Sequence, residues 1–419
     1  MKIGIITIGD ELLLGQVIDS NSAKMANMIY PLGLKIEKKW CISDQHEAIL
    51  SCMAQAEAEL DLILVTGGLG PTRDDITKKT MAEFFGVPLV FSDENYQHIL
   101  SLFNARNIPV REEQKSQCFI PEGTRLLENK MGTAMGLYFQ HHKKHWFAMP
   151  GVPYEMEYIM QNSVLPFLQQ HRSHERIMHK TIHIVGLGET DIAARLEPLL
   201  HDIPREMTLA YLPSIGLVKF RLTMKSENEQ WMSEQLDHYI NVCKNELGDK
   251  VFSASDDNLE SVVANLLNEK NFTLGLCESC TGGFLSYRFT TMPGASDYFK
   301  GTIVCYSNEI KINLLKVQES TLNQFGAVSE ETVKELVIGG IKTLNVDCCI
   351  SISGIAGPSG GTIEKPVGTI WIAVGNAENQ LTKKLLLGKD RKRNIEGAST
   401  YALILCREWL LKQTQKLIN

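Results

Sequence analysis

The sequence predicts an α/β protein with two α/β domains and a small α+β domain between them. Short apolar runs alternate with helical segments in residues 1–170 and again in 257–419. Such alternation is typical of sheets with helices on both faces. Residues 177–250 follow a β-α-β-β-α order instead, and hydrophilic stretches at 169–176 and 253–258 separate the three parts. We therefore predict three domains with these bounds.

Composition excludes several classes of protein. The chain has 419 residues, of which 44% are hydrophobic and 22% charged, with a net charge of −7. This balance is typical of a globular protein and gives no electrostatic footprint for nucleic acid or for an anionic membrane. No apolar stretch approaches the roughly 18 residues of a membrane span, and the first residues lack a signal-peptide pattern. We expect a cytoplasmic protein whose ten cysteines, which lack metal-type spacing, are reduced.

The first domain should contain a parallel sheet. Strands are predicted at residues 3–8, 34–41 and 62–66, with helices at 20–30 and 45–59 between them. The carboxyl ends of parallel strands meet at one edge of a sheet, which is where α/β proteins bind ligands.

Two loops at that edge carry chemically useful residues. Residues 9–15 include Asp10 and Glu11, and residues 66–77 combine three glycines with Asp74 and Asp75. Glycines after a strand let backbone N–H groups approach a phosphate, and paired carboxylates suit Mg²⁺ or a similar divalent cation. Alternatively, the aspartates only cap the helix predicted at 76–85, and Asp10 and Glu11 only form a turn.

The remainder of the first domain contains a helical insertion at 92–117 and two short strands at 136–140 and 145–149. Between these strands, His141 and His142 are predicted to lie in an exposed turn, because the sequence places no further metal ligand beside them. A helix is predicted at 154–170.

The middle domain resembles a KH-type arrangement. Its strands are predicted at 180–185, 207–212 and 217–225, and its helices at 190–200 and 227–247. The Gly186-Leu187-Gly188-Glu189 segment lacks the G-x-x-G spacing that clamps nucleic acid. We therefore interpret this domain as a spacer or dimerisation domain and expect a homodimer without nucleic acid.

The third domain has a serine on a strand-to-helix turn, Glu278-Ser279-Cys280-Thr281-Gly282-Gly283. Such a turn projects the serine hydroxyl, while the N–H groups of the following residues face the same point. The arrangement favours a nucleophile with an oxyanion hole, or a bound phosphate. Two alternatives remain: Ser279 only caps a helix, or Cys277 and Cys280 form a redox C-x-x-C pair.

Tyr306 ends the next predicted strand, residues 301–306, and Lys311 lies in the first turns of the helix that follows. The positive end of the helix dipole disfavours an ammonium group. A buried lysine there could act as a neutral base toward a serine hydroxyl, with the tyrosine relaying the proton. Alternatively, Lys311 is a surface residue and Tyr306 a packing residue.

A glycine-rich loop follows the strand predicted at 346–353. So many glycines in one loop are expected where the backbone approaches a ligand closely. We predict that this loop binds a phosphorylated ligand together with nearby cations, of which Arg391 is an additional candidate. The candidate residues are Gly354, Ala356, Gly357, Gly360, Gly361, Lys365 and Arg393.

These motifs resemble the CinA competence/damage-inducible family over nearly the whole chain. In the third domain the resemblance rests on the serine turn, Pro293-Gly294-Ala295-Ser296, Tyr306-Ser307-Asn308, Gly326-Ala327-Val328-Ser329, Gly354-Ile355-Ala356-Gly357-Pro358 and Lys365-Pro366-Val367-Gly368. In the first domain it rests on Ile8-Gly9-Asp10-Glu11-Leu12-Leu13, Thr66-Gly67-Gly68-Leu69-Gly70-Pro71-Thr72 and Met149-Pro150-Gly151-Val152-Pro153.

The resemblance implies two enzymatic activities. The C-terminal domain would be an α/β/α amidohydrolase that deamidates nicotinamide mononucleotide (NMN), with Ser279 as nucleophile beside Tyr306 and Lys311, the oxyanion near Thr281, Gly282 and Gly283, and no cofactor. The N-terminal domain would have a three-layer molybdopterin-binding fold and cleave ADP-ribose with a divalent metal ion at Asp74 and Asp75. Its ligand-binding candidates are Gly9, Asp10, Glu11, Asn21, Asp44, Thr66, Gly67, Gly68, Gly70 and Gly151.

Two other functions stay open on the sequence. The N-terminal domain could bind a pterin or nucleotide without turnover, or the protein could act as a partner in DNA uptake or recombination. The net charge argues against direct DNA binding.

Overall fold

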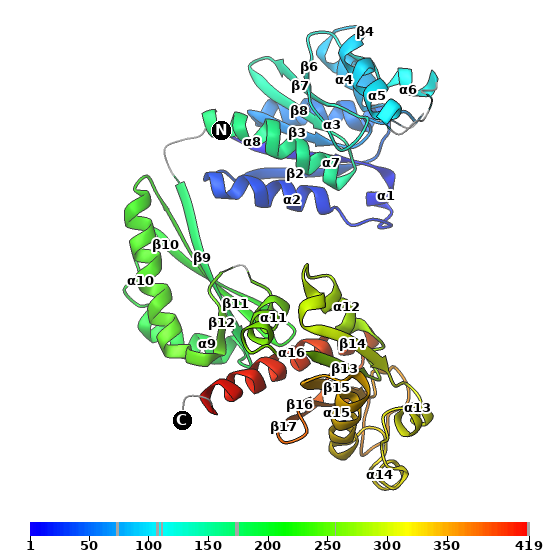
Figure 1. Ribbon diagram of the computed structural model, residues 1–419. Coiled ribbons are helices and arrows are strands. Elements are labelled where there is room, and N and C mark those ends of the chain that lie inside the picture. Colours follow the sequence, from blue (N-terminus) through cyan, green and yellow to red (C-terminus); the bar gives the residue numbers. More distant parts are fainter. Residues whose placement is uncertain (73–74, 106–108, 110–111, 172–175, 256, 417–419) are drawn as a thin grey trace. The chain divides into compact units, whose positions relative to one another are not determined.

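The computed structural model describes residues 1–419 except 73–74, 106–108, 110–111, 172–175, 256 and 417–419. The chain forms two compact units (Figure 1), residues 1–178 with 224–233 and residues 179–223 with 234–419. Parts of both predicted linkers lie outside the described residues. Within the described chain, no helix is both long and apolar enough to cross a membrane.

The N-terminal sheet has six strands in the order β2-β1-β3-β8-β7-β6. The first four run parallel, which confirms the predicted parallel pairing of β1, β2 and β3, whereas β7 pairs antiparallel with β8 and β6 pairs antiparallel with β7. The two-residue connection between β7 and β8 accounts for this difference, because a parallel pair needs a long crossover. The strands are β1 (Ile3–Ile8), β2 (Ile36–Ile42), β3 (Leu62–Thr66), β6 (Arg125–Leu127), β7 (Gly136–His141) and β8 (Lys144–Met149).

Helices cover both faces of this sheet and complete a three-layer domain. Apolar residues of α2 (Ser20–Ile29), α7 (Pro153–Ile159) and α8 (Leu165–His171) form one core with the sheet. Those of α3 (His46–Glu59) and α4 (Thr77–Phe85) form the other. A π-helical turn, Met160–Val164, joins α7 to α8, and α1 (Asp10–Leu13) follows β1 directly.

The predicted helical insertion contains α5 (Asp93–Ala105) and α6 (Glu112–Ser116). A two-stranded ribbon of β4 (Leu89–Phe91) and β5 (Phe119–Pro121) flanks it, which was not predicted. Three-residue strands are too short to show a clear period-2 pattern in the sequence.

The middle sheet has the order β10-β11-β9-β12. Its β9 (Arg176–Val185), α9 (Glu189–Leu196), β10 (Met207–Ser214), β11 (Leu217–Ser226) and α10 (Glu229–Leu247) follow the predicted order. The additional strand β12 (Val251–Ser253) pairs with β9, so the linker predicted to begin at residue 253 overlaps a strand. Short 3₁₀ turns lie at Tyr30–Leu32, Glu197–Leu199, Gly248–Lys250 and Ala295–Asp297.

The C-terminal sheet has the order β14-β13-β15-β16-β17. The first three strands, β14 (Phe299–Val304), β13 (Leu274–Glu278) and β15 (Cys348–Gly354), are parallel. Strand β16 (Thr369–Gly375) runs opposite to β15, and β17 (Gln380–Leu386) reverses again. The carboxyl ends of β14, β13, β15 and β17 therefore lie at the same edge of the sheet.

Helices also cover both faces of this sheet. Helices α11 (Leu259–Glu269), α12 (Phe284–Thr290) and α16 (Arg391–Lys416) contribute to one core. Helices α14 (Glu319–Phe325) and α15 (Glu330–Leu344) contribute to the other. The short helix α13 (Asn308–Asn313) lies between β14 and α14.

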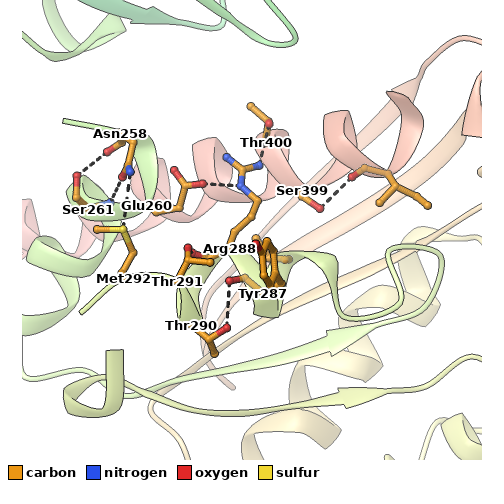
Figure 2. Close-up of polar contacts among 12 residues, drawn as sticks. Asn258, Glu260, Ser261, Tyr287, Arg288, Thr290, Thr291, Met292, Ser399 and Thr400 are labelled. Atoms are coloured by element: carbon orange, nitrogen blue, oxygen red, sulfur yellow. Dashed lines mark hydrogen bonds and ion pairs between the residues drawn. The ribbon is translucent and has the colours of Figure 1, made fainter. Parts of the chain in front are cut away.

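A largely buried ion pair holds three helices of this domain together (Figure 2). The Arg288 Nε of α12 lies 2.5 Å from the Glu260 Oε1 of α11, and the Arg288 Nη1 donates a hydrogen bond to the Thr400 hydroxyl of α16 at 2.9 Å. Since α12 begins directly after the serine turn, this pair anchors the helix that carries the turn.

Candidate functional site

The serine turn follows β13, the central strand of the parallel part of the C-terminal sheet. Ser279 is mostly buried, and its N–H donates to the Ile352 carbonyl of β15 at 2.9 Å. The Gly282 N–H donates to the Ser279 carbonyl at 3.2 Å, which closes the turn. Gly282 and Gly283 both have positive φ angles, a conformation that favours glycine. These backbone hydrogen bonds fix the turn against β15, and the Ser279 side chain remains available for chemistry.

Glu278 fixes the start of α12. Its fully buried carboxylate accepts hydrogen bonds from the N–H groups of Gly283 (3.0 Å), Leu285 (3.2 Å) and Ser286 (2.9 Å). A carboxylate satisfies these donors and also complements the helix dipole. The sequence left Glu278 without a role, and the structure identifies it as a cap for the helix.

These contacts change the predicted oxyanion site. The sequence pointed to N–H groups at Thr281, Gly282 and Gly283, but those of Gly282 and Gly283 already have acceptors. In the described part of the chain, the N–H groups of Cys280 and Thr281 have none. The available backbone donors are therefore one residue closer to the serine than predicted.

Lys311 lies against Ser279 from the neighbouring helix α13. Its side chain is 1% exposed, and its Nζ is 3.3 Å from the Ser279 Oγ. The carbonyls of Cys305 and Tyr306 lie 2.6 and 3.4 Å from the same nitrogen. Lys311 is therefore not a surface residue, and the turn after β14 brings it directly to the serine.

Burial lowers the pKa of the Lys311 amine, although interactions with the Cys305 and Cys280 thiols oppose that effect. A neutral amine has two N–H donors and one lone pair. The Cys305 and Tyr306 carbonyls can accept the two N–H groups, which leaves the lone pair to accept the Ser279 proton. The geometry suits a lysine general base.

Tyr306 lies two residues beyond β14, not at its end as predicted, and it is 63% exposed. Its hydroxyl accepts a hydrogen bond from the Arg391 Nη2 at 3.4 Å. In the described contacts, this hydroxyl bonds neither to Lys311 nor to Ser279. The predicted proton relay through the tyrosine is therefore absent from this conformation, in which the lysine reaches the serine directly.

Arg391 connects this tyrosine with the glycine-rich loop. Its Nη1 donates to the Gly357 carbonyl at 2.8 Å, and it lines a pocket of about 560 Å³ together with Thr281, Gly282, Phe284 and Lys392. The Thr281 hydroxyl is buried and has no hydrogen-bond partner among the described residues. Such a buried hydroxyl leaves a polar atom available to a ligand of this pocket, which Glu396 also lines.

The glycine-rich loop begins at the carboxyl end of β15, beside the serine turn. Asn394, which is buried in α16, binds the Ala356 carbonyl at 2.9 Å and so fixes the loop. Gly354 packs so closely against Ile370 that a Cβ atom would lie 2.6 Å from that side chain. Gly360 and Gly361 are exposed and have no assigned contact with the serine.

Two predicted cations do not reach this pocket. The Lys365 amine donates to the Phe325 carbonyl at the end of α14, at 2.6 Å. Arg393 is exposed and is not among the residues that line the pocket. Arg391, two residues earlier on α16, takes the predicted position instead, because residues two apart on a helix point in different directions.

The cysteines do not support a redox pair. All ten are free, and burial raises the pKa of the Cys280 thiol to about 12. Cys277 donates to the Leu336 carbonyl on the other side of the sheet. A buried thiol with a high pKa is a poor nucleophile.

The N-terminal domain has a second candidate site at the carboxyl ends of β1, β2, β3 and β8. A pocket of about 360 Å³ opens there. Most of the predicted ligand-binding residues line it, namely Gly9, Glu11, Asp44, Gly67, Gly68, Gly70, Asp75 and Gly151. The parallel strands therefore bring together residues up to about 140 positions apart, as the fold class predicted.

Asn21 and Thr66 line a smaller neighbouring cavity of about 120 Å³. The Asn21 Nδ2 donates to the Gly151 carbonyl at 2.8 Å and to the Thr66 hydroxyl at 3.2 Å, while the Thr66 hydroxyl donates to the Pro150 carbonyl. These two side chains therefore position the Pro150-Gly151 loop that forms one wall of the larger pocket.

The predicted metal ligands have different outcomes. Asp75 lines the pocket, and its Oδ2 accepts hydrogen bonds from the N–H and the hydroxyl of Thr72. Asp74 lies outside the described residues. Asp10 is exposed in the first turn of α1 and is not among the lining residues. Its neighbour Glu11 lines both cavities instead.

Glu155 is a site residue that the sequence analysis missed. It lies in the first turn of α7, is 8% exposed and lines the larger pocket. Its carboxylate accepts a hydrogen bond from the buried Asn129 at 2.6 Å, and burial raises its pKa. A glutamate two residues after Pro150-Gly151-Val152-Pro153 was the available signal, because that turn follows a parallel strand.

The pocket suits a divalent cation bound together with a phosphate. Four carboxylates line it, those of Glu11, Asp44, Asp75 and Glu155. In the described residues, no three of them lie close enough to form a ready set of ligands. Mg²⁺ typically uses one or two carboxylates and takes its other ligands from phosphate and water, so this arrangement fits such an ion.

Three family models together match nearly the whole chain. Residues 4–170 match the family described as "Probable molybdopterin binding domain", residues 179–253 match "Damage-inducible protein CinA KH domain", and residues 256–410 match "CinA C-terminal domain". These matches confirm the predicted fold classes.

Relatives of similar length match along nearly the whole chain. A CinA-like protein of Cytophaga hutchinsonii is 39% identical over 406 residues, covering 97% of both chains. Another from Chloroherpeton thalassium is 38% identical over 414 residues, covering 97% of this chain and 98% of the relative. The crystal structure of the competence damage-inducible protein A from Klebsiella pneumoniae is 33% identical, covers 36% of this chain and 95% of its own, and superposes with a TM-score of 0.36. The chain belongs to the CinA family.

Proposed function

We propose that the C-terminal domain hydrolyses the carboxamide of nicotinamide mononucleotide to nicotinate mononucleotide and ammonia. The observation that carries this proposal is the buried Lys311 amine, 3.3 Å from the Ser279 hydroxyl. A lysine with a lowered pKa beside a serine is suited to acyl transfer at a carboxamide. Arg391 and Lys392, which line the neighbouring pocket together with Glu396, would bind the 5′-phosphate.

The reaction would proceed through an acyl-enzyme. Neutral Lys311 takes the Ser279 proton as the serine oxygen attacks the amide carbon, and the Cys280 and Thr281 N–H groups stabilise the resulting oxyanion. Removing such a donor typically costs about 3 kcal/mol in the transition state. Lys311 then gives its proton to the departing nitrogen, which leaves as ammonia. Water, deprotonated by the same amine, hydrolyses the ester and releases nicotinate mononucleotide.

The test is ammonia release from NMN by the full chain and by two variants, Ser279→Ala and Lys311→Met. Both variants should lose at least about a thousandfold in kcat while retaining the far-ultraviolet circular dichroism of the folded protein. Undiminished turnover by Ser279→Ala would exclude the serine as nucleophile.

We infer that the N-terminal domain cleaves the pyrophosphate of ADP-ribose with a divalent metal ion. Glycines of the loops after β1, β3 and β8 line the same pocket as four carboxylates, which supports binding of a metal-bound diphosphate. The N–H groups of Gly9 and Gly67 already donate to the Ile42 and Met149 carbonyls, so Gly68, Gly70 and Gly151 would supply the backbone donors. Asp75 and Glu11 would hold the metal, which would neutralise charge on the phosphates. Glu155, with its raised pKa, would hold a proton near the attacking water.

Incubating ADP-ribose with Mg²⁺ and measuring AMP tests this second activity. Asp75→Asn and Glu155→Gln should abolish AMP formation, as should removal of the metal with a chelator, while NMN turnover by the C-terminal domain stays unchanged. Binding of ADP-ribose without AMP formation would leave a nucleotide-binding module, and absence of both would contradict the assignment of the pocket.

A further inference from the structure

A histidine-carboxylate cluster lies in the N-terminal domain, away from its pocket. It consists of Glu57 near the end of α3, His141 at the end of β7 and His142 in the loop before β8. One ligand atom from each residue lies within 4.8 Å of the other two. The sequence analysis dismissed metal binding here because it found no carboxylate, but Glu57, 84 residues before His141, supplies one.

The three side chains face one another closely. The His141 Nδ1 is 2.7 Å from one oxygen of Glu57, and the His142 Nδ1 is 3.5 Å from the other. Zinc ligands in a tetrahedral site, at about 2.0–2.1 Å from the metal, lie about 3.3 Å from one another. Because the three ligand atoms lie within 4.8 Å of one another, side-chain shifts of about 1.5 Å or less would bring them to one ion.

The fold holds two of these ligands in place. Glu57 and His141 are each 19% exposed, and the His141 ring packs against Phe84 and Phe85 of α4 and against Phe139 of β7. His142 is 74% exposed, which leaves the cluster open to solvent on one side. An ion could enter from that side, and a water molecule could complete its coordination.

The backbone directs His142 toward the cluster. The β7–β8 loop has two residues, His142 and Lys143, and both have positive φ angles of 47° and 69°. Such a two-residue turn allows consecutive histidines to place their Nδ1 atoms against the same carboxylate. The neighbouring Lys144 amine is occupied by Asp61 at 3.4 Å.

We propose that Glu57, His141 and His142 bind a divalent transition-metal ion of the zinc, nickel or cobalt class. Two imidazoles and one carboxylate are typical zinc ligands, whereas Mg²⁺ prefers oxygen alone. The cluster lies at the start of β8, at the edge of the sheet opposite the pocket. This ion is therefore distinct from the metal proposed for the reaction, and it would fasten the β7–β8 hairpin to α3.

The experiment is a zinc titration of the full chain without an affinity tag, in the presence of a reductant, excess Mg²⁺ and a chromophoric chelator. The wild-type protein should bind one zinc ion and gain thermal stability. Glu57→Gln and His142→Asn should each weaken zinc binding by at least about tenfold. Asparagine tolerates positive φ angles, so His142→Asn keeps the turn while it removes the ligand.

Two control variants locate the bound ion. His46→Ala removes a histidine that pairs with Glu83 between α3 and α4, and Cys41→Ser removes the exposed thiol of the chain. Both should bind zinc as the wild type does. Absence of zinc binding, or equal binding by His142→Asn and wild type, would overturn the proposal. Binding lost only in Cys41→Ser would assign the ion to the thiol and also overturn it.

Discussion

The Lys311 amine lies 3.3 Å from the Ser279 hydroxyl, whereas the Tyr306 hydroxyl binds Arg391. The Cys305 and Tyr306 carbonyls of the β14–α13 turn orient the amine. Helix α13, which carries Lys311, follows the strand next to the one that precedes Ser279. The nucleophile and the base thus follow two adjacent parallel strands, β13 and β14, and small changes of either turn would separate them.

The lowered pKa of Lys311 predicts how the amidase activity depends on pH. Only the neutral amine can accept the serine proton, so kcat/KM should fall as the pH falls through the pKa of this lysine. Because burial lowers that pKa, the fall should occur below the ordinary value of 10.5. A pH-rate profile for ammonia release from NMN measures it. A rate that still rises up to pH 10.5 would show that Lys311 remains charged in the protein.

Tyr306→Phe distinguishes a proton relay from a binding role. The hydroxyl contacts Arg391, so its loss should raise KM for NMN several-fold and leave kcat within about threefold of wild type. Arg391→Lys should also raise KM, because a lysine cannot reach Gly357 and Tyr306 together. Steady-state kinetics separate the two constants. A hundredfold loss of kcat in Tyr306→Phe would instead restore the relay predicted from the sequence.

Glu278→Gln should destabilise the C-terminal domain and slow the amidase. The amide would turn an N–H group toward the backbone donors that the carboxylate now satisfies, at a cost of roughly 1–3 kcal/mol in the free energy of unfolding. The turn that carries Ser279 would shift with the start of α12, so kcat should fall. Urea unfolding and NMN turnover measure both effects. The matched control is Glu309→Gln, an exposed glutamate in the first turn of α13, which should change neither.

In the ion pair between Arg288 and Glu260 (Figure 2), removing one partner should destabilise the protein more than removing both. Glu260→Ala leaves the mostly buried guanidinium without its carboxylate partner and should lower the free energy of unfolding by roughly 3 kcal/mol. The double variant Glu260→Ala, Arg288→Met should regain part of the free energy of unfolding that Glu260→Ala loses. Glu408→Ala, which breaks an exposed pair with Lys412, should cost less than about 0.5 kcal/mol. Equal effects of Glu260→Ala and Glu408→Ala in urea unfolding would contradict the role of burial.

Several features could be predicted from the sequence because they depend on local patterns. Alternating apolar runs and helical segments predict the parallel strands, and strand polarity then places Ser279, Lys311 and the loop after Ser353 at one edge. The same argument places Asp75 and Gly151 together in the first domain. These predictions need the order of the elements along the chain, and they do not depend on side-chain orientation.

Only the tertiary structure decided which groups are free to act. Glu278 occupies the N–H groups of Gly283, Leu285 and Ser286, so the available oxyanion donors move to Cys280 and Thr281. The rotation of α16 selects Arg391 rather than Arg393, and the hairpin before β8 brings His141 to Glu57. Such choices depend on contacts between residues far apart in the chain and on competition for hydrogen bonds, and a sequence pattern records neither.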